Sequence, residues 1–246
     1  MECDVMIARA VYTAMMYASM PVALTRLLWR SRNEPGYRRH WGERFGRHPS
    51  MRFSESPIWV HAVSVGETRA AAPVIAELER RHPGVPYDLP GATAKFLAHY
   101  RPRLGLIMET EIWPNLTSAC RRERIPLYLV NARLSEKSYQ GYTRVGSIVR
   151  AALGDLSGVA AQSIDDAERL LALGAPQPTV TGNVKFDVAI PDEQLTQGLR
   201  WRSDWGTRPV VLAASTRDGE EALLIDAARP LFEAGVLLVI VPRHPR

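Results

Sequence analysis

The sequence predicts an α/β protein built on parallel sheets. Short apolar segments of strand length alternate along the chain with segments that carry helix-start signals or one apolar face. Polar side chains follow several of these strands where each strand ends, and no internal repeat or low-complexity tract interrupts the pattern. The 246 residues, 46% hydrophobic and 23% charged, are ordinary for a globular protein and suffice for one large domain or two modest ones.

The first element is an apolar segment near the amino terminus. Residues 10–25 carry no charge, and Arg9 and Arg26 bracket them. A full bilayer span needs about 20 residues, so three interpretations stay open: a marginal span with snorkelling arginines, an interfacial amphipathic helix, or a buried core helix. Glu2 and Asp4 precede the segment and no small-residue cleavage site follows, which argues against a removable signal peptide. We expect a membrane anchor over residues 1–30.

A basic block follows the apolar segment. Seven arginines and two glutamates lie between Arg26 and Arg47, so this block holds a surplus equal to the net charge of +5 of the whole chain. A nucleic-acid-binding protein more often spreads its basic residues over a domain face. A basic block beside an apolar segment fits an anionic membrane surface and a cytoplasmic globular part, so we expect no nucleic-acid partner. Cys3 and Cys120 fit no metal or redox spacing, which indicates a reducing compartment.

The next elements are a strand over residues 58–63, a tight turn, and an amphipathic helix from Glu67 to about residue 81. In open α/β sheets ligands bind at the carboxyl ends of strands, which makes Glu67 a candidate catalytic carboxylate. Ser64 and Glu67 also have the spacing of a capping box, in which Glu67 only closes the helix end. The spacing alone favours neither interpretation.

The remaining elements are predicted from apolar runs and from caps. Pro90 and Pro114 suit the first turn of a helix, and Ser163 suits an N-cap, with Gly174 just past the end of that helix. The segment 190–191 reads as a linker. The expected strands are 104–108, 127–130, 158–161, 179–181, 210–214 and 237–241. The expected helices are 90–97, 114–122, 164–173, 191–201 and one that begins at Gly219.

The candidate site residues are the polar side chains just past these strands: Glu67, Glu109, Glu111, Asn131, Arg133, Ser215, Thr216 and Arg243. The dinucleotide fingerprint, the phosphate-loop lysine motif, the nucleophile elbow and His/Cys clusters are missing, which argues against hydride transfer, triad hydrolysis and zinc chemistry. Carboxylates with basic residues suit a general base that deprotonates a hydroxyl while cations receive an anionic leaving group.

At this point the chain resembles the 3-deoxy-D-manno-octulosonic acid (Kdo) transferases of lipopolysaccharide biosynthesis. The resemblance covers nearly every segment, and its motifs, in this order, are specific. They are Tyr37-Arg38-x-x-Trp41-Gly42-Glu43-Arg44-Phe45-Gly46, His61-Ala62-Val63-Ser64-Val65-Gly66-Glu67-Thr68, Glu109-Thr110-Glu111-Ile112-Trp113-Pro114-Asn115, Asn131-Ala132-Arg133-Leu134-Ser135, Thr181-Gly182-Asn183-Val184-Lys185-Phe186-Asp187, Ser215-Thr216-x-x-Gly219-Glu220-Glu221 and Val241-Pro242-Arg243-His244-Pro245.

The resemblance implies a GT-B glycosyltransferase, with two Rossmann-like domains that face a cleft. It implies transfer of Kdo from CMP-Kdo to a lipid A precursor, with inversion and with neither a catalytic metal nor a cofactor. The protein is then expected at the cytoplasmic face of the inner membrane, held by one amino-terminal anchor. The expected divisions are the anchor (1–30), the acceptor domain (31–190) and the start of the nucleotide-sugar domain (191–246).

The resemblance also implies residue roles. Glu67 matches the family's proton acceptor, and Glu109 and Lys185 match groups that support the transition state. Pro242 and Arg243 match a pair that contacts CMP. From the residues themselves, free amides at the helix start after Ser215 and Thr216 are expected to help bind phosphate.

The chain departs from the family pattern in two places. Between Pro86 and Tyr87 the family has about 30 more residues, a strand and a helix of the kind that completes a βαβ unit. The chain also ends at Arg246, where the nucleotide site of the second domain begins. We therefore expect either an incomplete record of a longer protein or a decayed copy. Two alternatives stay open: another GT-B glycosyltransferase that uses a different sugar nucleotide, and an inactive membrane-tethered remnant. The number of Kdo units added and the oligomeric state are not predicted.

Overall fold

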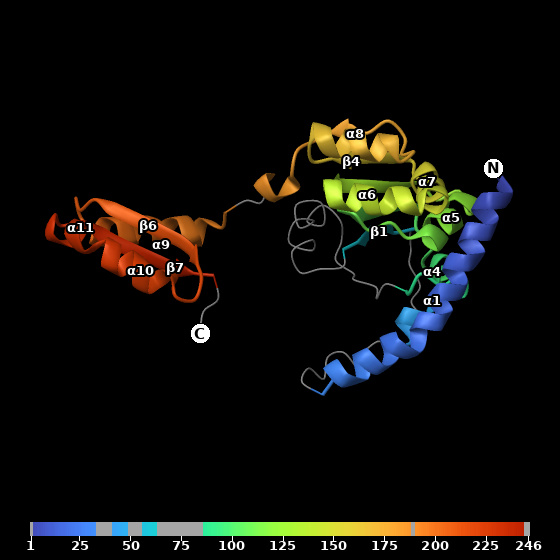
Figure 1. Ribbon diagram of the computed structural model, residues 1–246, viewed down its shortest axis with the longest axis horizontal. Coiled ribbons are helices and arrows are strands. Elements are labelled where there is room, and N and C mark those ends of the chain that lie inside the picture. The colour runs from blue at the N-terminus through green and yellow to red at the C-terminus, as the bar shows by residue number, and fades with distance from the viewer. Residues whose placement is uncertain (1, 33–40, 49–55, 63–85, 188–189, 244–246) are drawn as a thin grey trace. The chain divides into compact units, whose positions relative to one another are not determined.

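The computed structural model describes residues 2–32, 41–48, 56–62, 86–187 and 190–243 (Figure 1). The chain forms two compact units, Met1–Val188 and Ala189–Arg246, and each is described by itself. Both units are α/β with parallel strands, as the sequence predicts.

Unit 1 contains a five-stranded parallel sheet in the order β1-β2-β3-β4-β5. The strands are β1 (Ile58–His61), β2 (Leu104–Met108), β3 (Leu127–Ala132), β4 (Gly158–Ala161) and β5 (Thr179–Val180). The bounds of β2 and β4 confirm the prediction, whereas β3 continues two residues beyond its predicted end. Because all neighbouring pairs are parallel, the carboxyl ends of the strands meet at one edge of the sheet.

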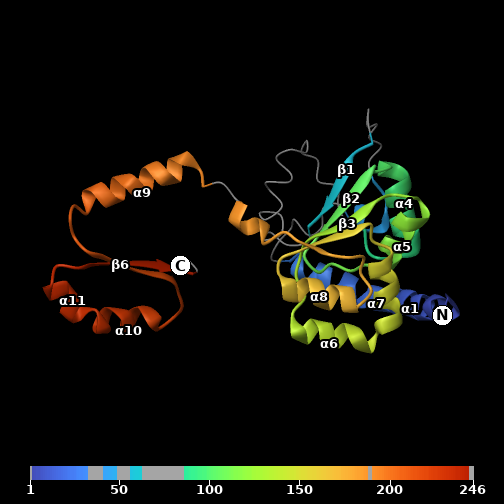
Figure 2. The same cartoon turned by 90° about the horizontal axis from the view of Figure 1, so that it is seen from above.

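Helices connect the strands of unit 1 (Figure 2). They are α4 (Pro90–Tyr100), α5 (Pro114–Arg122), α6 (Glu136–Arg144), α7 (Gly146–Gly154) and α8 (Ile164–Ala172), with the short 3-10 turns η2 (Glu43–Phe45) and η3 (Val184–Asp187). The residues predicted to begin helices occupy helix starts in the structure. Pro90 and Pro114 occupy first turns, and the Ser163 hydroxyl accepts a hydrogen bond from the Asp166 amide. Neither α6 nor α7 was predicted from the sequence; α6 is mostly polar and buries none of its residues, whereas α7 buries Ile148, Val149, Ala152 and Leu153.

The core of unit 1 lies between the sheet and these helices. Phe96, Leu116, Leu129, Leu153 and Leu170 come from α4, α5, β3, α7 and α8, and each is at most 1% exposed. Side chains alternate along a strand, so the next residues point to the other face. There Met108 packs with Val60, Val130 and Val184 in a smaller cluster. This second face therefore receives η3, which carries Lys185.

A long helix, α1 (Glu2–Arg30), completes unit 1. Among the described residues it is the one helix whose length and composition would allow it to cross a membrane. The structure ties it to the rest of the unit through Asp88, which is 1% exposed. The Asp88 carboxylate accepts hydrogen bonds from the Tyr12 hydroxyl (2.9 Å) and from the amides of Asn115 (3.1 Å) and Leu116 (2.9 Å) at the start of α5.

Asp88 thus caps α5 from another part of the chain. The Asn115 side-chain amide returns the contact by donating to the Asp88 carbonyl at 2.8 Å. Burial raises the pKa of Asp88, and the hydrogen bonds from Asn115, Tyr12 and Leu116 offset part of the rise. Sequence inspection missed this role because the donors and the acceptor are far apart along the chain.

We expect Asp88→Ala to lower the free energy of unfolding by about 2–4 kcal/mol, because it leaves two buried backbone amides without an acceptor. Urea denaturation followed by circular dichroism measures this loss. Asp165→Ala is the matched control, since the Asp165 side chain is 76% exposed, and it should cost less than about 1 kcal/mol. Equal losses in the two variants would contradict the capping role of Asp88.

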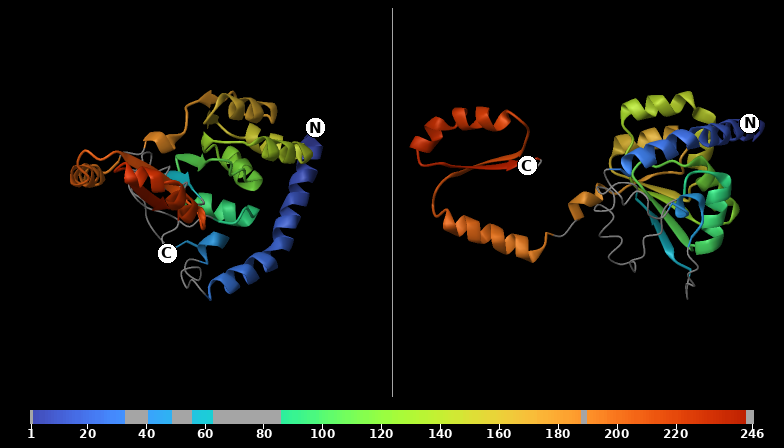
Figure 3. Two further views of the ribbon diagram at one scale, coloured as in Figure 1. Left: turned by 60° about the vertical axis from the view of Figure 1, so that its left-hand side comes forward. Right: turned by 90° about the horizontal axis from the view of Figure 1, so that it is seen from below.

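Unit 2 contains two parallel strands, β6 (Val210–Thr216) and β7 (Leu237–Pro242). Its helices are α9 (Asp192–Asp204), α10 (Glu220–Ala227) and α11 (Arg229–Glu233). Helix α9 lies on one side of the strand pair and α10 with α11 on the other (Figures 2 and 3). Ser215 and Thr216 belong to the end of β6 rather than to the turn after it, because the strand continues two residues beyond its predicted end.

Candidate active site

The carboxyl edge of the sheet in unit 1 brings together two predicted site residues. Glu109 follows β2 directly, and Lys185 lies in η3, 76 residues further along the chain. The Lys185 ammonium Nζ is 3.3 Å from the Glu109 carboxylate Oε1, as both a hydrogen bond and an ion pair. The structure therefore places a carboxylate and a cation side by side at the edge where α/β proteins bind ligands.

Asn131, at the end of β3, holds η3 in place. Its side-chain oxygen Oδ1 accepts a hydrogen bond from the Val184 amide at 3.2 Å, and the residue is fully buried. Its backbone carbonyl accepts from Gln162 Nε2 at 2.9 Å, and Gln162 Oε1 accepts from Asn183 Nδ2 at 3.1 Å. Two separate hydrogen-bonded routes thus connect β3 to the turn that carries Lys185. Sequence analysis placed Asn131 at a strand end but missed this positioning role.

Left-handed backbone conformations occur at the carboxyl ends of strands in both units. Glu109, Asn131 and Ser215 have positive φ values of 60°, 55° and 62°, in the left-handed region that L-residues other than glycine seldom adopt. The two other such residues in the described part of the chain, Arg101 and Arg124, follow helix ends, where this conformation is common. Strain of this kind is often retained at functional sites.

The Glu109–Lys185 pair is open to solvent. The side chains are 25% and 50% exposed, respectively. Ion pairs exposed to this degree contribute about 0–1 kcal/mol to stability. The pair is therefore accessible to a ligand and contributes little to the stability of the fold.

Two other candidates have a different place in the structure. Glu111 accepts a hydrogen bond from Trp113 Nε1 at 2.7 Å, and the Trp113 ring packs edge-on against His61, with centroids 5.2 Å apart. Burial, with a smaller contribution from the Glu111 charge, raises the pKa of the Tyr142 hydroxyl. Glu111 thus orients Trp113, which is a packing residue. The other candidate, Arg133, is exposed.

Glu67 lies outside the described residues, as does Ser64, so its two interpretations stay predictions. The structure does show where the chain enters that segment. His61, the last residue of β1, pairs in register with Ile107 of β2. The chain therefore leaves β1 at the sheet edge where Glu109 follows β2.

The four predicted binding residues of unit 2 lie at the carboxyl edge of its strand pair. Thr216 pairs in register with Pro242, and the Arg243 amide donates to the Thr216 carbonyl at 3.0 Å. Ser215 precedes them with its left-handed backbone. The structure therefore gathers Ser215, Thr216, Pro242 and Arg243 within unit 2.

Two glutamates in the first turn of α10 bind polar groups of the segment that precedes the helix. Glu220 Oε2 accepts from the Arg217 amide at 2.8 Å, and Glu221 Oε1 accepts from the Thr216 hydroxyl at 2.6 Å. A phosphate at this helix start would compete with these two groups. Within the described ranges, no cluster of three or more His, Cys, Asp or Glu side chains is arranged to hold a metal ion.

We expect Asn131→Gly and Asn131→Ala to lower catalytic turnover by about 10-fold or more each, because both lose the bond that positions Lys185. The two variants should differ in stability. Glycine tolerates the φ of 55°, whereas alanine adds a strain of roughly 1 kcal/mol. Turnover measurements and urea denaturation of both variants separate the two effects. A loss of turnover in the alanine variant alone would show that strain, and not the lost hydrogen bond, is responsible.

Comparison with known proteins identifies the family. A family model described as 3-Deoxy-D-manno-octulosonic-acid transferase (kdotransferase) matches residues 39–86 and 82–188, more than half of the chain. The 3-deoxy-D-manno-octulosonic acid transferase of Bordetella pertussis is 42% identical over 227 residues, which include 78% of this chain and 53% of that protein. The protein of the same name from Haemophilus influenzae is 31% identical over an alignment of 274 positions, which covers 96% of this chain and 64% of the relative.

More distant matches extend the comparison. A probable mitochondrial transferase of the same name from Arabidopsis thaliana is 30% identical over 95% of this chain and 61% of its own length. A solved structure of UDP-GlcNAc 2-epimerase from Neisseria meningitidis is similar with a TM-score of 0.45 and 15% identity, over 75% of this chain and 66% of that one. The last similarity is too weak to bear on function.

The chain spans between about half and two thirds of the length of these curated relatives. The two stretches matched by the family model contain Glu109, Asn131 and Lys185, and the match confirms the resemblance seen in the motifs. The chain belongs to the 3-deoxy-D-manno-octulosonic acid transferase family.

Proposed function

We propose that this protein is an inverting glycosyltransferase that moves Kdo from CMP-Kdo to a lipid A precursor in lipopolysaccharide biosynthesis. The observation that carries the proposal is the Glu109–Lys185 pair, 3.3 Å apart at the carboxyl edge of the sheet, within the region that the family model matches. Carboxylates and cations at such an edge suit a reaction that removes a proton and releases an anion.

In the proposed reaction an acceptor hydroxyl attacks the anomeric carbon of Kdo. A bond forms between the acceptor oxygen and that carbon as the bond from the carbon to the CMP phosphate oxygen breaks. Glu67 takes the hydroxyl proton, and CMP leaves with the electron pair. Lys185 and Arg243 offset the negative charge that develops on the leaving phosphate. Glu109 supports the positive charge that develops at the anomeric carbon in an oxocarbenium-like transition state.

The proposal divides these tasks between the two units in a GT-B arrangement. Unit 1 is the acceptor domain, and unit 2 binds the nucleotide through Ser215, Thr216, Pro242 and Arg243. The hydrogen bond from the Arg243 amide to the Thr216 carbonyl supports this assignment, because it gathers the four residues at one strand edge.

We also propose a location at the cytoplasmic face of the inner membrane, with α1 as the anchor. The length and apolar composition of α1 support this assignment. Its end, and the segment that follows, carry the block of seven arginines between Arg26 and Arg47, which fits an anionic lipid surface. The acceptor is itself a phosphorylated glycolipid, so an enzyme that acts on it gains from being held at that surface.

The test is a transfer assay with the chain, CMP-Kdo and a lipid A precursor in mixed lipid vesicles, read by mass spectrometry of the lipid. The expected product is heavier than the precursor by one or more Kdo residues, and CMP should compete with the donor more strongly than UDP. The Bordetella pertussis relative is the positive control. Absence of product under conditions in which that relative forms it would contradict the proposed activity of this chain.

A further inference from the structure

Helix α1 has one face that is less exposed than the rest, and its amino-terminal half packs against unit 1. Its half-buried residues recur every three or four positions, which is the spacing of a single helical face. They are Val5, Ala8, Arg9, Tyr12, Thr13, Met16, Met20, Ala23, Leu24 and Leu27. The amino-terminal half of this face packs against the core of unit 1 through Ala8 and Tyr12, and Figure 1 shows that half of α1 beside α7 and α5.

The amino-terminal half of α1 is held by polar contacts. Three of its side chains bind residues at or near α5 and α7. These contacts join Tyr12 Oη to Asp88 Oδ2 (2.9 Å), Thr13 Oγ1 to Asn115 Oδ1 (3.2 Å), Arg9 Nη1 to Ser118 Oγ, and Arg9 Nη2 to Asp155 Oδ2 (3.8 Å). These contacts are directional, so they fix the rotation of α1 as well as its position.

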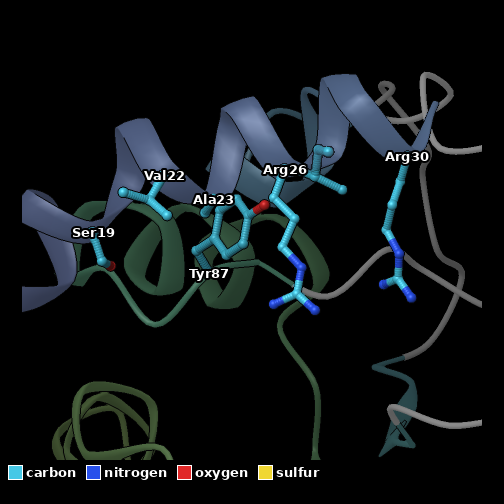
Figure 4. A pocket seen from close by; sticks show the side chains of 7 residues that line it. Ser19, Val22, Ala23, Arg26, Arg30 and Tyr87 are labelled. Atoms are coloured by element: carbon cyan, nitrogen blue, oxygen red, sulfur yellow. The ribbon is translucent and has the colours of Figure 1, made fainter. Parts of the chain in front are cut away.

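The carboxyl-terminal half of α1 borders a groove of about 460 Å³ with Tyr87 on its other side (Figure 4). Arg26 and Arg30 extend from the helix along this groove, and Val22, Ala23 and Leu27 line its apolar part. Tyr87 is the neighbour of Asp88, which binds the other half of the helix, and its amide donates to the Arg44 carbonyl at 2.8 Å. Tyr87, which borders the carboxyl-terminal half of α1, is thus next in sequence to the residue that binds the amino-terminal half.

The outward face of α1 is apolar and exposed. Its large side chains are between 50% and 73% exposed, far more than is usual for an apolar cluster of this size in water. They are Met6, Ile7, Val11, Met15, Tyr17, Val22, Leu28 and Trp29. A helix that is apolar all round needs a second apolar environment besides the protein.

A membrane span does not fit these contacts. From Arg9 to Arg30 the helix rises about 32 Å at 1.5 Å per residue, which equals the thickness of the hydrocarbon core. A spanning α1 would place Arg9 and Arg30 at opposite surfaces of that core. The part of unit 1 that binds Arg9, Tyr12 and Thr13 would then lie against lipid, and it includes the Arg121–Asp155 ion pair, whose arginine side chain is 66% exposed. Such charges are excluded from lipid.

We infer that α1 lies in the plane of the membrane surface, with its outward face in the lipid and both of its ends on the side of unit 1. This inference rests on the membrane location proposed above and specifies its geometry. The partner is a bilayer that contains anionic phospholipid. The apolar outward face supplies burial, and Arg26 and Arg30 at the carboxyl-terminal end supply attraction to phosphate headgroups.

Cys3 makes the geometry testable. It is exposed near the start of α1, whereas Cys120 is buried and its pKa is raised to about 12 by that burial. A maleimide that cannot cross membranes therefore reacts with Cys3 alone. The chain is added to preformed vesicles of phosphatidylcholine with phosphatidylglycerol, so that unit 1 stays outside, and the bound fraction is isolated by flotation and labelled. Cys3→Ser is the control for labelling elsewhere.

We expect the chain to float with the vesicles and Cys3 to be labelled to the same extent before and after detergent is added. Labelling that appears only after detergent would show that α1 spans the bilayer, which overturns the inference but leaves the membrane attachment intact. A chain that does not float at all would overturn the membrane location and the inference with it.

The charge requirement has its own test. Arg26→Gln and Arg30→Gln should each weaken binding to these vesicles by about fivefold at low salt. Arg200→Gln, a change of an exposed arginine in unit 2, is the matched control and should leave binding unchanged. Binding that is insensitive to both Arg26→Gln and Arg30→Gln would contradict the choice of anionic lipid as the partner.

Discussion

Replacing Lys185 by alanine is expected to lower kcat for Kdo transfer by about 10²–10³-fold. The proposed role of Lys185 is to offset charge that develops on the leaving phosphate, and removing one such preorganised group typically costs that much. KM for CMP-Kdo should change less than kcat, because the interaction strengthens as the charge develops. Steady-state kinetics with varied CMP-Kdo separates the two constants.

Stability distinguishes this role from a structural one. The Glu109–Lys185 pair is partly exposed, so Lys185→Ala should change the free energy of unfolding by less than about 1 kcal/mol. Lys137→Ala removes an exposed lysine from α6 and is the matched control for loss of a positive charge. If Lys185→Ala leaves kcat at the level of Lys137→Ala, Lys185 has no part in the transition state.

Glu67→Gln should have the largest effect, a fall in kcat of about 10²–10⁴-fold, because glutamine cannot accept the proton of the attacking hydroxyl. The pH dependence of kcat/KM carries the sharper signal. In the unmodified protein activity should fall at acidic pH as Glu67 becomes protonated. The residual activity of Glu67→Gln should not show this fall at acidic pH.

Ser64→Ala tests the competing interpretation of Glu67 as a helix cap. It removes the capping hydroxyl but leaves the carboxylate, so it should cost about 1 kcal/mol of stability and retain both kcat and the acidic limb. If Glu67→Gln behaves in the same way, with a loss of stability and an unchanged pH profile, Glu67 is a cap and not the base.

Local signals in the sequence predicted much of the fold. The bounds of β2, β4 and α5 match their predicted ranges, and Ser163 caps α8 as expected. Prolines, helix caps and apolar runs influence only residues within one or two helical turns, so they can be recognised directly in the sequence. Helices α6 and α7 were not predicted, although Ser135 caps α6 and α7 has buried residues at helical spacing.

The candidate site was predicted in its members but not in its assembly. Glu109 and Lys185 were identified by motif, yet their separation of 3.3 Å depends on a sheet that brings β2 close to η3. Asn131 was seen at a strand end, while its bond to the Val184 amide appears only in the folded chain. Asp88, which joins α1 to α5, carried no local signal.

The sequence by itself determined the fold class, the family and the candidate carboxylates and cations, because these follow from local patterns and from ordered motifs. Only the tertiary structure decided which of those groups meet, which asparagine holds them, and which residues of unit 1 bind α1. An apolar run of this length is compatible with spanning, interfacial and core helices alike. The contacts of Tyr12 with Asp88 and of Thr13 with Asn115 join residues more than 70 positions apart, so no local pattern could have predicted them.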